Sequence, residues 1–181
     1  MSGLDILMIL VFLIMCGVSV VRKLVRQTIS VGVVYLATIA AGSLYRAFAT
    51  FVQAIGGATP SLTQFIMFWL IFIVFSIIME ALLGQGFDDM SLPKIGVLDK
   101  ILAVIPGAIC ALVVVCLMLT SFGYSTVASW SFLEPLRIMI ARGYQGSALA
   151  PILGPALKFY LALHGLWFVR LPPLLAYALP E

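Results

Sequence analysis

Four long apolar runs constrain this chain more than any other feature of its sequence. They cover residues 4–21, about 29–51, about 65–83, and from about 98 or 101 to 122. At the helical rise of about 1.5 Å per residue, such runs can cross a hydrocarbon core of about 30 Å. The composition agrees, because 64% of the residues are hydrophobic, 9% are charged and the mean hydropathy is +1.21. We therefore predict an all-α integral membrane protein with a four-helix transmembrane domain over residues 1–122.

The remaining segment, residues 123–181, is predicted to be a membrane-interface tail. Ser131 with Glu134 forms a capping-box pattern that predicts a short helix to about Arg142, stopped by Gly143. Residues 149–169 predict a second interfacial helix, with Phe159, Leu163, Leu166 and Trp167 on its broad apolar face.

A fifth span over residues 149–169 is the alternative for this part of the tail. It would place Lys158 near mid-membrane depth, at a cost of roughly 2.5–3.5 kcal/mol. Pro151 and Pro155 just before it also disfavour a regular span. We therefore expect four spans with interfacial helices after them, and keep five spans as the alternative.

The positions of the cations predict the orientation. Arg22, Lys23 and Arg26 follow the first run, and Lys94 and Lys100 precede the fourth. Cytoplasmic loops retain Lys and Arg, so both loops are expected inside and the N-terminus outside. This predicts a multi-pass membrane protein with the Arg22 and Lys94 loops in the cytoplasm.

Three charged residues inside or beside the spans are candidates for function, because such residues are costly in lipid. Asp5 and Arg46 fall near the outer face and are expected to form an intramembrane pair. Glu80 falls near the inner face, where it can reach only the cationic loop after the first run or Lys100.

Small residues repeat on the faces of two spans, which permits close helix packing. They are Ala37 and Ala41 in the second run and Ala103, Gly107 and Ala111 in the fourth. The single histidine, His164, is a weak candidate for a haem or chlorophyll ligand, and we predict no cofactor and no metal site. No nucleotide-binding, nucleophile-elbow or zinc-protease motif is present, so we expect a protein that is not an enzyme.

Two segments resemble the colicin V production protein family. In the first, "LDILMILVFLIMCGVSVVRKLVRQTIS", Asp5, Arg22, Arg26 and Ser30 match, while Lys23 and Gln27 depart from the usual Gly and Glu. In the second, "LDKILAVIPGAICALVVV", Asp99 and Gly107 match, Lys100 is a conservative change and Ala103 replaces a Gly. The resemblance covers about residues 4–122, with a fainter match at "SALAP", residues 147–151.

The resemblance implies an inner-membrane protein linked to colicin V export and envelope homeostasis, and it supplies no catalytic residues. Its expected partners are the lipid bilayer and other membrane proteins, in a complex or as a homo-oligomer. The net charge of +3 argues against nucleic acid. One alternative is an accessory subunit of a large energy-transducing or photosynthetic complex. Another is a small channel or transporter that uses Asp5, Arg46 and Glu80.

Overall fold

The computed structural model describes residues 2–56, 59–87, 97–130, 133–168 and 170–177. Four long helices follow the four apolar runs: α1 (Gly3–Val21), α2 (Leu24–Gly56), α3 (Pro60–Phe87) and α4 (Val97–Ser125). The tail forms α5 (Glu134–Gln145), α6 (Ala150–Leu163), the short 3₁₀ helix η1 (His164–Leu166) and α7 (Pro173–Ala176). The described residues contain no strand, which confirms the predicted all-α membrane fold.

A capping box and a proline mark the starts of two of the long helices. The Ser2 hydroxyl caps α1, and the Asp5 carboxylate completes the capping box by accepting the Ser2 N–H. Pro60 begins α3, at a position where a missing N–H costs nothing. The fourth helix runs to Ser125, three residues past the boundary expected at residue 122.

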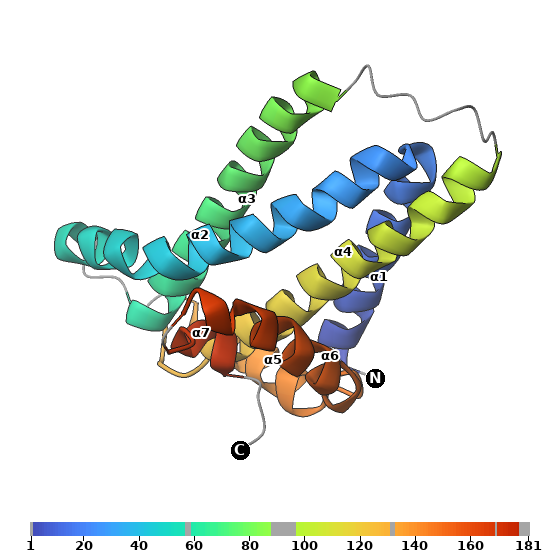
Figure 1. Cartoon of the computed structure of the whole chain (residues 1–181). Coiled ribbons are helices and arrows are strands. Elements are labelled where there is room, and N and C mark those ends of the chain that lie inside the picture. Colours follow the sequence, from blue (N-terminus) through green and yellow to red (C-terminus); the bar gives the residue numbers. More distant parts are fainter. Residues whose placement is uncertain (1, 57–58, 88–96, 131–132, 169, 178–181) are drawn as a thin grey trace.

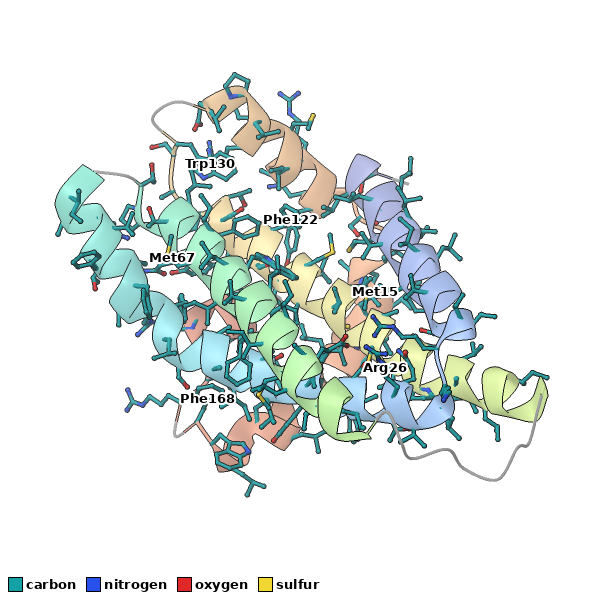
Figure 2. All side chains as sticks on the ribbon, turned by 90° about the horizontal axis from the view of Figure 1, so that it is seen from above. Met15, Arg26, Met67, Phe122, Trp130 and Phe168 are labelled. Atoms are coloured by element: carbon teal, nitrogen blue, oxygen red, sulfur yellow. The ribbon has the colours of Figure 1, made fainter. Side chains whose placement is uncertain are left out.

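The fourth helix is the centre of the fold. All the other α-helices pack on α4, and α2 also packs closely on α3. Figure 1 shows α5, α6 and α7 gathered at the end of the bundle where the N-terminus lies. We call this the amino end, and the opposite end, where α1 passes into α2, the Arg22 end. Figure 2 shows Arg26 at the Arg22 end and Met15 between α1 and α4.

Apolar side chains fill the centre and also cover much of the outside. The largest fully buried side chains include Tyr45, Phe68, Met8, Leu117 and Leu157. In contrast, α3 exposes a long apolar face formed by Ile66, Leu70, Ile73, Val74, Ile77, Ile78 and Leu82. Such a face is expected where lipid or another membrane protein replaces water.

The helix α5 differs from its predicted bounds. It continues through Gly143 to Gln145, so the predicted stop at Gly143 is wrong. This glycine instead permits close contact with α1, because a Cβ there would lie 3.3 Å from Leu4 Cβ. Ser131 of the predicted capping box lies outside the described residues.

The carboxylate of Glu134 nevertheless bonds back to the preceding backbone, accepting the Trp130 N–H at 2.8 Å. Arg137 Nε also donates to both of its oxygens, at 2.9 Å each. The hydrogen bonds from Arg137 and from the Trp130 N–H lower the pKa of Glu134 below its usual value.

The following helix, α6, packs one face on the bundle and exposes the other. Its buried side chains are Leu153, Leu157, Tyr160 and Leu161, and at 14 residues it is too short to cross a bilayer alone. Its axis and that of α5 are bent by 88° relative to each other. Four described helices are long and apolar enough to span a membrane, and a fifth span would require α5 and α6 to act as one bent segment.

Candidate functional site

A polar cluster at the Arg22 end is built from three helices. Arg22 is the C-cap of α1, Ser30 lies near the start of α2 and Glu80 near the end of α3. Arg22 Nη1 donates to Glu80 Oε1 at 3.1 Å and to Oε2 at 3.3 Å, and the Ser30 hydroxyl donates to Oε1 at 2.8 Å. We call Arg22, Ser30 and Glu80 the Arg22 cluster. Its ion pair confirms the prediction that Glu80 reaches the cationic loop.

An ion pair that is partly shielded from water holds this cluster together. The side chains of Arg22 and Glu80 are 33% and 32% exposed, so water screens the pair only in part. Arg22 also follows the last turn of α1, where the helix dipole favours a cation. The buried Ser30 hydroxyl adds a hydrogen bond to the carboxylate, and such charge-assisted bonds are the stronger ones.

Replacing Glu80 with Gln tests the contribution of the ion pair between Arg22 and Glu80 to stability. The amide keeps an acceptor for Ser30 but loses the charge that holds Arg22, so we expect a loss of about 1 kcal/mol in the free energy of unfolding. Thermal unfolding of the purified protein in detergent measures the change. The matched control is Arg26→Gln, which removes an exposed charge that forms no ion pair among the described residues. An equal effect of the two changes would contradict the assignment.

A close helix crossing positions the cluster. Gly107 of α4 faces Ser19, which lies one turn before Arg22 on α1. A Cβ on Gly107 would lie less than 3.0 Å from both Oγ and Cβ of Ser19, and 3.2 Å from Gln27 Nε2. The Ser19 hydroxyl donates to the Met15 carbonyl at 2.8 Å, which removes its donor from the helix interface. The absence of a side chain at Gly107 therefore allows α1 and α4 to meet.

A second polar cluster lies at the amino end, around the carboxylate of Asp5. This carboxylate is fully buried. It accepts hydrogen bonds from the Ser147 hydroxyl, from the Ala148 N–H at 3.1 Å and from the Ser2 N–H at 2.8 Å. We call Asp5, Ser147 and Ala148 the Asp5 cluster.

The Asp5 cluster stands at the N-terminus of α6. Leu149 is the N-cap of that helix, and the Ser147 oxygen accepts the Ala150 N–H at 3.2 Å. A carboxylate is favoured at a helix N-terminus, where unpaired N–H groups carry partial positive charge. Asp5 thus caps α1 with one set of bonds and fastens α6 to it with another.

The two clusters share a chemical character. Every charged group in them is bonded to a partner on another segment of the chain. Such an arrangement ties helices together and holds their relative positions. A family model described as colicin V production protein matches residues 4–158, a range that contains both clusters. The chain belongs to this family. No curated protein and no solved structure matched the chain.

The structure brings together positions at which the sequence resembles the colicin V production family. Asp5 from the first segment meets Ser147 of the "SALAP" segment, 142 positions away. Arg22 and Ser30 meet around Glu80, which the resemblance did not include. The family model reaches residue 158, beyond the predicted limit near residue 122. The faint match in the tail was the one sequence signal that pointed to Ser147.

One departure from the family pattern, Gln27, lies beside the close crossing of α1 and α4 at Gly107. Gln27 is buried, its Nε2 lies beside Gly107, and its Oε1 has no hydrogen-bond partner among the described residues. Of the other two departures, Lys23 is exposed and Ala103 is buried.

The predicted pair of Asp5 with Arg46 does not form. Arg46 is exposed on α2, and its Nε donates to the neighbouring Tyr45 hydroxyl at 3.1 Å. The acceptors of Asp5 are already occupied at the N-terminus of α6. The tail therefore supplies the partners of Asp5, Ser147 and Ala148, in place of the predicted partner Arg46.

The small residues predicted to pack are buried in the structure. Ala103, Gly107 and Ala111 of α4 and Ala37 and Ala41 of α2 all lie inside the bundle. Gly42, beside this α2 face, would place a Cβ 3.1 Å from the Phe168 ring. Both faces therefore pack within one copy of the chain.

The histidine lies at the end of α6 and is fully buried. His164 Nδ1 lies 2.9 Å from the Tyr160 carbonyl, which requires the ring to donate there. The rings of Tyr35 and Tyr160 each lie 4.5 Å from the imidazole, and Nε2 is buried without a partner in the described structure. Side chains thus cover the whole ring.

The remaining family positions lie at the Arg22 end. Arg26 is exposed, and its carbonyl lies 3.2 Å from the Ser30 hydroxyl. The side chains of Asp99 and Lys100 and the loop that contains Lys94 lie outside the described residues.

Proposed function

We propose that this chain is a multi-pass protein of the bacterial inner membrane that is not an enzyme and supports secretion or envelope homeostasis by contacting other membrane proteins. The observation that carries the proposal is the use of the family-matching polar residues. In both clusters these residues bond helices to one another, as a rigid scaffold requires. Family membership adds the link to colicin V production.

The surface for partners is the apolar face of α3 defined above. Among the spans, α3 has the smallest share of residues buried inside the fold. Helices associate in membranes through such faces when their shapes fit. A partner seated there would leave the Arg22 cluster intact, because Glu80 reaches inward to α1 and α2.

Photo-cross-linking in living cells tests this proposal. A photoreactive residue at Ile73 or Ile77 should give discrete cross-links to other membrane proteins, because both side chains are exposed. The matched control is the same residue at Ile14 of α1, which is exposed to a similar degree on another helix. Equal cross-linking to lipid alone at all three positions would contradict a partner surface on α3.

Complementation separates a scaffold from an enzyme. In a strain that exports colicin V and lacks this protein, the Ser30→Ala variant should restore most of the export, because Arg22 still pairs with Glu80. A variant at Ile77 that prevents partner contact, Ile77→Trp, should not restore it. Loss of export with Ser30→Ala in a protein of normal stability would contradict the scaffold and favour chemistry at Ser30.

The same proposal places the N-terminus outside, which site-specific labelling tests. A cysteine at Lys23, exposed at the Arg22 end, should react with an impermeant thiol reagent only from the cytoplasmic side. A cysteine at Gln145, exposed at the end of α5, should react only from outside. The two positions serve as controls for each other, and reversed labelling would overturn the orientation.

Mild-detergent purification distinguishes this proposal from an accessory subunit of a large complex. Recovery as a small homo-oligomer, or with a few secretion components, agrees with the proposal. Recovery as a fixed part of an energy-transducing assembly would contradict it.

A further inference from the structure

The helices α6 and η1, together with Arg170 after them, expose both large apolar side chains and cations. Phe159 is 71% exposed, Leu163 47%, Leu166 92% and Trp167 62%. Lys158 before this set and Arg170 after it are also exposed. The opposite side of the same segment is packed on the bundle, so the exposed face has a definite orientation.

These cations have no anionic partner in the described structure. Asp5, Glu80 and Glu134 are the carboxylates whose side chains the structure describes. Each of them is engaged elsewhere, in the Asp5 cluster, in the Arg22 cluster or with Arg137. No carboxylate among the described residues therefore pairs with Lys158 or Arg170, and both side chains are exposed to an external anion.

The segment is held rigidly against α2. The Trp167 indole N–H donates to the Tyr35 hydroxyl at 2.9 Å, and that hydroxyl donates to the Leu163 carbonyl at 2.9 Å. The Thr38 and Tyr160 hydroxyls are hydrogen-bonded at 2.7 Å. The exposed face is thus preformed, and binding would not need to order it.

We propose that this face, formed by Lys158, Phe159, Leu163, Leu166, Trp167 and Arg170, is a binding site for anionic phospholipids. The apolar side chains lie against the upper acyl chains, while Lys158 and Arg170 bind the headgroup phosphates. A free phosphate ion would satisfy the cations but leave the apolar side chains in water, whereas a lipid satisfies both. The site does not depend on the role in secretion or on the orientation of the chain.

Fluorescence quenching by brominated lipids tests the site directly, because Trp167 lies within it. The protein is reconstituted in phosphatidylcholine bilayers that contain either brominated phosphatidylglycerol or brominated phosphatidylcholine at the same fraction. Emission of the Trp167→Phe variant is subtracted to remove the contributions of Trp69 and Trp130. We expect Trp167 to favour the anionic lipid by about fivefold for each cation at low salt.

Charge variants identify the groups responsible. The Lys158→Gln/Arg170→Gln variant should lose the preference, while Lys158→Arg/Arg170→Lys should keep it. The Lys23→Gln/Arg26→Gln variant removes two exposed cations at the Arg22 end and should also keep it. Equal quenching by both lipids in the unaltered protein would overturn the proposal, as would a preference that survives in the glutamine variant. Absence of quenching by either lipid would show that Trp167 does not contact lipid acyl chains, and would overturn it as well.

Discussion

The Gly107→Ala variant should unfold at a much lower temperature than the unaltered protein, with a loss of about 3 kcal/mol in the free energy of unfolding. The added methyl group would lie less than 3.0 Å from Oγ and Cβ of Ser19. Rotation of the serine side chain cannot relieve the clash, because its Cβ is fixed by the backbone. The two helices α1 and α4 must therefore move apart, which also displaces Arg22 from Glu80. Thermal unfolding in detergent measures the effect.

A second substitution identifies the cause. Ser19→Gly removes both clashing atoms, so Gly107→Ala combined with Ser19→Gly should recover most of the lost stability. Ser19→Ala removes only the hydroxyl and should recover little. The matched control is Gly17→Ala on α1, where a Cβ would meet nothing within 4 Å. If Gly17→Ala and Gly107→Ala destabilised the protein equally, the loss would come from a general effect of an added methyl group, and not from the crossing of α1 and α4, because helix propensity alone would make both variants more stable.

The Asp5→Ala variant should release the tail from the bundle. It leaves the Ser147 hydroxyl and the Ala148 N–H without their acceptor inside the protein, and hydrogen bonds to a buried charge contribute about 1.5–3 kcal/mol each. We expect a loss of about 3 kcal/mol in the docking of α6, with more effect on the tail than on the four spans. Limited proteolysis between α5 and α6 should accelerate, and thermal unfolding should occur earlier.

A control for this variant must separate the two roles of Asp5. Ser2→Ala removes the hydroxyl that caps α1 but leaves the bonds of Asp5 to Ser147 and Ala148 in place. It should lower overall stability by about 1 kcal/mol and leave cleavage of the tail unchanged. Faster cleavage in Ser2→Ala, equal to that in Asp5→Ala, would show that fraying of α1 and not the Asp5 cluster controls the tail.

Much of the architecture could be predicted from local patterns. The lengths of the apolar runs predicted all four long helices, and the Arg22 loop predicted the partner of Glu80. The candidate site was predicted less completely. Ser147 was noted only as part of a faint family match, and its bond to Asp5 was not expected. The helix α5 continues past its expected stop at Gly143, where the lack of a side chain permits close contact with Leu4, and the local sequence pattern contains no sign of this contact.

The sequence by itself determined which four segments form helices long and apolar enough to span the membrane. Hydropathy and length are local properties of the sequence, and they can be compared directly with the thickness of a bilayer. The tertiary structure alone decided which polar groups meet. Asp5 had two possible partners at the same end of the bundle, Arg46 and the start of α6, and the charge pattern favoured the first. Docking of α6 brought the Ser147 hydroxyl and the Ala148 N–H to the carboxylate, and Arg46 remained exposed. Contacts across 142 positions depend on how helices pack, and no local pattern of residues contains that information.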